Sequence, residues 1–191
     1  MKQINAKLKP APEPQKLLKL DLGSGQSPRE GFEGVDFVAA PGVKHVVDLL
    51  KFPWPFKDAS VEEAHCSHFF EHVPQMLRGK FMDELHRVLV PEGKATFICP
   101  YYTSIRATQD FTHMWPPISP NTFLYFNKGW REQNKLTHGH YDLKCDFDFV
   151  YGYAINGNWA ARNDEARNFA VQNYINAIDD LHVTLTKRKQ E

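Results

Sequence analysis

The sequence has no excess charge of either sign, few cysteines and no long apolar run. Lys plus Arg and Asp plus Glu number 23 each, so no net field draws the chain to nucleic acid or to an anionic membrane. Its three cysteines, Cys66, Cys99 and Cys145, include no Cys-x-x-Cys pair, which argues against a disulfide framework and a cysteine-ligated zinc site. This composition favours a small-molecule partner and a reducing, cytoplasmic setting.

No apolar run approaches the roughly 18 residues of a membrane-spanning helix. Residues 1–15 also lack the hydrophobic middle of a signal peptide, so neither a membrane span nor export is expected. Prolines among lysines in residues 1–16 predict a flexible N-terminal arm. The remaining residues, 17–191, are enough for one α/β domain and too few for two.

The most informative stretch is the apolar run 17–22 and the turn that follows it, Gly23-Ser24-Gly25. The run is typical of a buried parallel strand. Its glycines allow positive φ, and they let a ligand approach the backbone closely at the carboxyl end of the sheet. Asp36 lies in a second predicted strand, 34–37, where its carboxylate can accept hydrogen bonds from ribose hydroxyls.

The glycine spacing argues against two common nucleotide sites. A dinucleotide-binding turn needs a third glycine three residues after the second, and Pro28 stands at that place. Asp36 also follows the turn well short of the usual separation of about 20 residues. The Gly-Lys-Ser/Thr ending of a phosphate-binding loop is absent.

Leu20-Asp21-Leu22-Gly23-Ser24-Gly25 resembles the first motif of the class I, Rossmann-like S-adenosylmethionine-dependent methyltransferases, and Asp36 matches that family's ribose-binding acid. Val46-Val47-Asp48-Leu49 is similar to the third strand, whose terminal Asp contacts the adenine amino group. Residues 60–68 resemble the fourth strand, and 89–94 the turn before the fifth. The resemblance implies an α/β Rossmann-like sandwich with a mostly parallel seven-stranded sheet, an antiparallel last strand and the order 3-2-1-4-5-7-6.

The resemblance also implies S-adenosyl-L-methionine as the cofactor. The residues expected to hold it are Asp21, Gly23, Ser24, Gly25, Asp36, Phe37, Asp48, Leu49, Ser67 and His68. The chain departs from the family between Gly25 and Gly34, where about 1.5 Å per residue leaves room for only about two helical turns. We therefore expect the first helix to be stunted or replaced by a loop, which affects contacts to the methionine end of the cofactor.

Hydrophobic spacing predicts the scaffold of the remaining chain. The expected elements are a helix from Pro74 that ends before Pro91, a strand over 94–99, a helix from Ser119 to Phe126, a strand over 140–153, a helix over 162–180 and a strand over 181–186. The proline-rich, aromatic segment 100–120 has no periodicity and is predicted to be a lid over the ligand end of the sheet. Packing or contact with a second copy in a homodimer accounts for the helix over 162–180.

Polar residues are densest at 65–72, directly after the fourth predicted strand. If a helix begins there, His68, Glu71 and His72 share one face and can hold a divalent metal ion. The cluster resembles the Glu-x-x-Glu-His element of metal-dependent relatives, including a ubiquinone-pathway O-methyltransferase and small-RNA terminal 2′-O-methyltransferases, with His68 in place of the first Glu. His113 is then the counterpart of their distant histidine ligand. Metal-free members also carry Ser-His-x-x-Glu-His, so a metal-free site is the alternative.

A metal-free enzyme still needs a base for an alcohol or amine acceptor. The catalytic candidates are His113, Asp110 and His68, with Tyr101 behind them. Asp110-Phe111-Thr112-His113 resembles an Asp-Pro-Thr-His segment of methyltransferases encoded near surface-glycan genes, which suggests a sugar or nucleotide-sugar acceptor. We expect O- or N-methylation of a small molecule. The alternatives are a non-catalytic cofactor-binding protein that acts by interaction, and a lyase that cleaves the cofactor.

Overall fold

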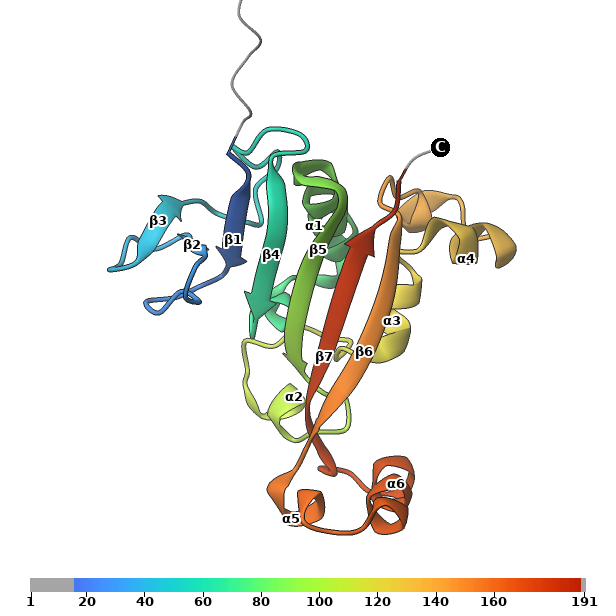
Figure 1. The fold of residues 1–191 in the computed structure, drawn as a ribbon. Helices are drawn as coiled ribbons and strands as arrows, with labels where there is room; N and C mark the ends of the chain where they lie inside the picture. The colour runs from blue at the N-terminus through green and yellow to red at the C-terminus, as the bar shows by residue number, and fades with distance from the viewer. Residues whose placement is uncertain (1–15, 190–191) are drawn as a thin grey trace, which may run out of the picture.

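One seven-stranded sheet organises the chain, in the order β3-β2-β1-β4-β5-β7-β6 (Figure 1). The computed structural model describes residues 16–189, so the predicted N-terminal arm lies almost entirely outside the described residues. The strands are β1 (Leu18–Leu22), β2 (Glu33–Asp36), β3 (Val43–Val46), β4 (Val61–Ser67), β5 (Leu89–Pro100), β6 (Phe147–Ile155) and β7 (Ile178–Lys187). Strands β1 to β5 pair in parallel, and β7 runs antiparallel to both neighbours. The predicted fold class and strand order are confirmed.

The helices are short except for one. They are η1 (Phe70–His72), α1 (Gln75–Val88), α2 (Arg106–Gln109), α3 (Pro120–Leu124), α4 (Lys128–Gln133), η2 (Gly139–Tyr141), α5 (Gly157–Ala160) and α6 (Asp164–Asn173). Figure 1 shows α1 and α3 behind the sheet, α4 beyond its β6 edge, and α5 and α6 beyond the end of β6 and β7. No helix within residues 16–189 is long and apolar enough to cross a membrane.

Helix α1 begins after Pro74, whose ring fits a helix N-terminus, as the sequence predicts. Phe81, Leu85 and Val88 are buried, and they pack the helix against the sheet. The ring of Phe81 lies 5.5 Å from that of Phe70, centroid to centroid, and 6.5 Å from that of Phe97. Part of the high aromatic content therefore forms a core between α1 and the central strands.

The segment between Gly25 and Glu33 contains no helix, so the predicted loss of the family's first helix is confirmed. The near face of the sheet in Figure 1 carries no helix from the described residues. Strand β7 fits this arrangement, because buried Leu181, Val183 and Leu185 alternate with more exposed residues. A strand with one solvent-exposed face needs apolar residues only at every second position.

The strand predicted over 140–153 begins only at Phe147. Backbone groups before it are bound by side chains instead of a neighbouring strand. The Arg131 guanidinium donates to the carbonyl oxygens of Leu143 (3.0 Å) and Cys145 (2.9 Å). The Asp83 carboxylate accepts the Cys145 amide proton at 2.9 Å. Apolar alternation therefore placed the start of this strand too early, because alternation cannot reveal hydrogen-bond partners that are distant in sequence.

Two other element boundaries differ from the prediction. The helix expected over 162–180 is α6, which ends at Asn173 because Tyr174 is extended, with ψ 143°. β7 then begins at Ile178, so the last residues of the expected helix pair with β5 and β6. The turn expected over 89–94 is part of β5, where a register shift against β4 and the positive φ of Glu92 (65°) mark a bulge.

Candidate active site

The glycine turn after β1 has the backbone conformation that its sequence predicts. Gly23 has φ 71° and Gly25 has φ 55°, both in the left-handed region. The amides of Gly23 and Ser24 donate to the carbonyl oxygen of Val35 at 2.8 and 3.2 Å, which fastens the turn to β2. A Cβ on Gly23 would stand 2.7 Å from the Cβ of Phe69 and closer still to its ring. The turn therefore requires glycine at position 23 for both conformation and space.

Asp36, at the end of β2, lies directly beside this turn. Its Oδ2 accepts the amide proton of Gly25 at 2.9 Å, and its Oδ1 accepts that of Val38 at 3.1 Å. Each carboxylate oxygen can accept a further hydrogen bond. Asp36 therefore holds the turn and retains acceptor capacity toward a ligand.

A cavity of about 170 Å³ opens beside this carboxylate; we name it the Asp36 cavity. Its lining residues are Gly23, Asp36, Phe37, Val47, Asp48, Leu49, Leu50, Phe69 and His72. The cavity is smaller than the roughly 300–1,000 Å³ of a typical ligand pocket, so it can enclose only part of a large ligand. Five of the residues predicted to hold the cofactor, namely Gly23, Asp36, Phe37, Asp48 and Leu49, line this cavity.

Asp48 lies two residues after β3, which ends at Val46, earlier than the predicted strand. Its Oδ1 accepts the amide proton of Leu50 at 3.0 Å, and its Oδ2 lies 3.4 Å from Lys51 Nζ. The loop that follows β3 thus presents Asp48 to the Asp36 cavity, although the strand itself ends short.

Asp21 bonds to other groups of the protein and does not line this cavity. It is 5% exposed; its Oδ2 accepts the amide proton of Arg29 at 2.7 Å, and its Oδ1 lies 2.8 Å from His65 Nδ1. The pair joins β4 to the loop that replaces the first helix. Sequence reasoning missed this role of His65, because 44 residues separate the partners.

The residues after β4 do not form the predicted helix. The strand runs to Ser67, His68 has φ 52°, and η1 covers only Phe70–His72. The left-handed backbone at His68 interrupts any helix at that point, because consecutive residues of a right-handed helix all need negative φ. His68 and His72 therefore do not share a helix face.

A second cavity of about 240 Å³ lies beside the first; we name it the His72 cavity. Its lining residues are His68, Glu71, His72, Pro100, Arg106, Gln109, Asp110 and His113. His72 lines both cavities, so they meet at this imidazole. The lid segment supplies five of these eight residues. Of the other residues predicted to hold the cofactor, Asp21, Ser24, Gly25 and Ser67 line neither cavity.

Three side chains of this second cavity are close enough to share one metal ion. One ligand atom each of Glu71, His72 and His113 lies within 4.8 Å of the others. Glu71 is 4% exposed, and neither of its carboxylate oxygens has a hydrogen-bond partner among the described residues. Burying a carboxylate without partners is costly unless a cation compensates it. The residues present therefore fit a divalent cation.

His68, the fourth predicted ligand, lies outside that group of three. Its Nδ1 is 3.4 Å from Glu71 Oε1, and this contact raises the pKa of His68 above its usual value. The raised pKa favours the protonated form, in which His68 is a counter-ion for Glu71 and has no lone pair for a metal on that nitrogen. The geometry therefore separates His68 from the metal-capable set and leaves it as a charge partner.

Hydrogen bonds assign the protonated nitrogens of the two other histidines. The Thr112 hydroxyl donates to Asp110 Oδ1 at 2.7 Å, so it accepts from His72 Nδ1 at 3.0 Å. His113 Nδ1 lies 3.2 Å from the carbonyl oxygen of Ala107, to which it can only donate. In the neutral form of either imidazole, Nε2 then carries the free lone pair, which can accept a proton or bind a metal.

Asp110 and Tyr101 are less suited to proton transfer than these imidazoles. Hydrogen bonds from the Thr112 hydroxyl and amide lower the pKa of Asp110, which makes it a weaker base. Tyr101 does not line the His72 cavity, and burial raises the pKa of its hydroxyl. Burial also raises the pKa of Cys66 and Cys99 well above the usual value, so neither is an activated nucleophile.

Comparisons with known proteins agree with this geometry. A family model described as a methyltransferase domain matches residues 35–97, which is a third of the chain. No curated protein sequence matches the chain. An S-adenosylmethionine-dependent methyltransferase from Archaeoglobus fulgidus is similar in structure, with TM-score 0.60 and 16% identity over 91% of this chain and 87% of that one.

Two further solved structures are similar over most of the chain. A methyltransferase from Methanosarcina mazei has TM-score 0.53 and 13% identity, over 92% of this chain and 95% of that one. A Burkholderia thailandensis 1,6-didemethyltoxoflavin-N1-methyltransferase, solved with its substrate and S-adenosylhomocysteine, has TM-score 0.52 and 12% identity, over 90% of this chain and 71% of that one. The chain thus has the fold of the class I methyltransferases it resembles, and the comparisons support a methyltransferase enzyme.

Proposed function

We propose that the chain, which has the class I methyltransferase fold, transfers a methyl group from S-adenosyl-L-methionine to an oxygen or nitrogen of a small molecule. One observation carries the proposal. The Asp36 cavity, bounded by the glycine turn and two carboxylates, meets the His72 cavity at a single imidazole. A cofactor site and an acceptor site of a methyltransferase must adjoin in this way, because the methyl group passes directly between them.

In this proposal the residues of the first cavity bind and orient the cofactor. Asp36 accepts hydrogen bonds from the ribose hydroxyls, and Asp48 faces the adenine amino group. The glycine turn lets the cofactor approach the protein backbone closely. When bound, S-adenosylmethionine supplies a sulfonium methyl group that an acceptor lone pair can attack in line. The protein contributes alignment of the reacting atoms and exclusion of water.

The proton of the acceptor goes to an imidazole of the His72 cavity. His72 and His113 both present Nε2 as the acceptor, for the hydrogen-bonding reasons given above. The bound cofactor would supply the methyl carbon, and its carbon–sulfur bond would break with the electron pair left on sulfur. The acceptor's proton then resides on the imidazole until solvent removes it.

A divalent metal ion is a second candidate component of this site. The buried carboxylate of Glu71, which accepts no hydrogen bond among the described residues and has His68 as its charge partner, favours it, with His72 and His113 as the other ligands. A bound metal would lower the pKa of an acceptor hydroxyl. His68 would then act as a positively charged neighbour of Glu71 in the metal-free state.

The segment 100–120 is proposed to be the lid of the acceptor site. It supplies Arg106, Gln109, Asp110 and His113 to the His72 cavity, and Phe111 at its tip is 97% exposed. Closure over a bound acceptor would bury this ring and exclude water. The domain is proposed to extend over 17–191. Three free, buried cysteines are consistent with a reducing compartment such as the cytoplasm.

Calorimetric titration tests the cofactor assignment. Purified protein is titrated with S-adenosylmethionine and with S-adenosylhomocysteine, and the titrations are repeated with Asp36→Ala. Asp142→Ala is the matched control, because Asp142 is exposed and lines neither cavity. We expect micromolar binding that weakens at least about tenfold in Asp36→Ala, since about 1.4 kcal/mol corresponds to a factor of ten. Equal affinity in the two variants would contradict the assignment.

A product assay separates methyl transfer from the two alternatives. Cofactor and product are quantified over hours with and without a panel of small acceptors, including sugars and nucleotide sugars. Product that appears only with an acceptor supports the methyltransferase. Cofactor loss without any acceptor would indicate a lyase, and tight binding without turnover would indicate a non-catalytic binding protein.

A further inference from the structure

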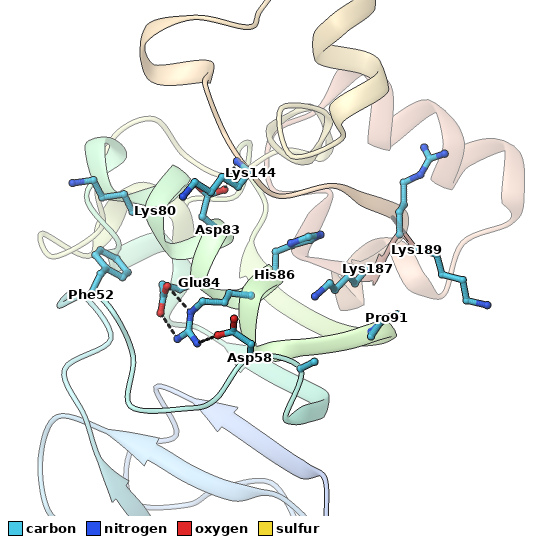
Figure 2. A pocket seen from close by; sticks show the side chains of 13 residues that line it. Phe52, Asp58, Lys80, Asp83, Glu84, His86, Pro91, Lys144, Lys187 and Lys189 are labelled. Atoms are coloured by element: carbon cyan, nitrogen blue, oxygen red, sulfur yellow. Dashed lines mark hydrogen bonds and ion pairs between the residues drawn. The ribbon is translucent and has the colours of Figure 1, made fainter. Parts of the chain in front are cut away.

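A larger cavity, of about 800 Å³, lies at the other end of the sheet (Figure 2). Asp58 and Ala59, which precede β4, and Pro91 near the start of β5 contribute to it. Lys187, the last residue of antiparallel β7, adds a further side. The glycine turn follows the opposite, carboxyl end of β1, so this cavity is separate from the proposed methyl-transfer site.

The cavity is richer in positive charge than the chain as a whole. Its six cationic lining residues are Lys80, Arg87, Lys144, Lys187, Arg188 and Lys189. Only three lining residues are carboxylates, namely Asp58, Asp83 and Glu84. The complete sequence has 23 positive and 23 negative side chains. The fold therefore gathers an excess of cations around this one concave surface.

Ion pairs account for three of these cations. Arg87 lies between Glu84 and Asp58, both labelled in Figure 2, and its guanidinium nitrogens lie 2.7 and 2.6 Å from their carboxylates. Lys189 Nζ lies 2.9 Å from Glu92. Arg188 Nε lies 3.7 Å from Asp146 Oδ2.

Lys80, Lys144 and Lys187 have no carboxylate partner among residues 16–189. Asp83, which lies among them, does not pair with an ammonium group. Its Oδ1 accepts the backbone amide protons of Lys144 and Cys145, each at 2.9 Å. Three unpaired ammonium groups therefore remain around the cavity.

Of the three lysines, Lys187 gives the clearest indication of an anion-binding site. Its Nζ donates to the carbonyl oxygen of Leu89 at 2.7 Å, and partial burial lowers its pKa. The carboxylate that acts on it, Asp58, already pairs with Arg87. A partly desolvated ammonium group without its own counter-ion favours binding of an anion.

His86 adds a second unsatisfied polar group to this wall. It is 6% exposed, and its Nε2 has no hydrogen-bond partner among the described residues. Burial and then the charge of Lys187 lower the pKa of His86 to about 4, so the imidazole is neutral at pH 7. It therefore adds no charge to the cavity, and Lys187 is the charged group of this wall.

We propose that this cavity binds a small phosphorylated molecule, whose phosphoryl group contacts Lys187, while Lys80 and Lys144 add positive charge elsewhere along the lining. Phosphoryl oxygens carry negative charge that the ammonium group of Lys187 can neutralise, and lysine binds phosphate as a point charge. The volume lies within the roughly 300–1,000 Å³ of small-molecule sites. Phe52 and Pro91 offer apolar surface for the remainder of the ligand. The proposal is independent of the methyltransferase assignment.

Calorimetric titration of the full chain with sodium pyrophosphate at low salt tests the proposal. We expect a dissociation constant below about 1 mM, and at least about tenfold weaker binding in Lys187→Met. Lys94→Met is the matched control, because Lys94 is exposed on β5 and does not line the cavity. Saturation of the protein with S-adenosylhomocysteine is expected to leave pyrophosphate affinity unchanged.

A second variant keeps the test decisive if loss of the Leu89 hydrogen bond unfolds Lys187→Met. Lys80 and Lys144 are both exposed, so the double variant Lys80→Met/Lys144→Met is expected to fold and to bind pyrophosphate at least about tenfold more weakly. Absence of binding by the unmodified chain would overturn the proposal. Equal affinity in the folded charge-removal variants and in Lys94→Met would overturn it too, because the anion would then bind elsewhere.

Discussion

Substitution of Gly23 by alanine is expected to strain the turn that holds the proposed cofactor site. Two costs add at this position. Its φ of 71° lies in the left-handed region, which costs an alanine about 1–2 kcal/mol. The new methyl group would also stand 2.7 Å from the Cβ of Phe69, and overpacking of this kind costs about 1–3 kcal/mol.

The sum, about 2–5 kcal/mol, is a large part of the roughly 5–15 kcal/mol that stabilises a folded domain. For a chain of this size about 1 kcal/mol corresponds to about 2–4 °C, so the midpoint of thermal unfolding should fall by roughly 4–20 °C. Cofactor affinity should fall as well, because displacement of Phe69 reshapes the Asp36 cavity that it lines.

Two other glycines separate the two costs in the same thermal unfolding assay. Gly25 also has positive φ (55°) but no atom within 4 Å of an added Cβ, so Gly25→Ala should lose only about 1–2 kcal/mol. Gly152 has neither the clash nor positive φ, and Gly152→Ala should leave stability nearly unchanged. If Gly23→Ala unfolds within about 2 °C of Gly25→Ala, the packing argument is refuted.

The other predictions concern buried polar groups. Asp21→Asn should destabilise the chain, because it removes the charge that bonds His65; an unchanged unfolding temperature would contradict this role. Glu71→Gln should abolish metal content, measured by elemental analysis, and activity together if the metal site is real; full metal-free activity would exclude it. The folded-state pKa of His86 is depressed to about 4, so the stability that its neutral form contributes is present above pH 6.5 and is lost as pH falls toward 4, by about 1–3 kcal/mol. Denaturant titrations of His86→Gln should show less of this acid loss than those of the exposed-site control His140→Gln; equal pH profiles would contradict the assignment.

Local signals in the sequence correctly predicted the elements that frame the site. The apolar run before Gly23, the stripe of α1 and the alternation of β7 each depend on residues close together in the chain. The position of Asp36 beside the glycine turn followed from the rule that parallel strands end at the same edge of the sheet. These inferences needed no knowledge of distant contacts.

Features that depend on distant partners could not be predicted. The delayed start of β6 depends on Arg131 and Asp83, whose bonds to the segment before the strand span 12 to 62 residues. The left-handed backbone of His68 replaced a predicted helix and removed this residue from the metal-capable group. The bond between Asp21 and His65 likewise has no signature in either local segment.

The central claim is that the two cavities joined at His72 are the cofactor and acceptor sites. A crystal structure of the chain with S-adenosylhomocysteine tests it most directly. We expect ribose hydroxyls within hydrogen-bond distance of Asp36, adenine near Asp48, and the sulfur directed toward His72 and the His72 cavity. Ligand density anywhere else, or a sulfur directed away from His72, would contradict this assignment of the two sites.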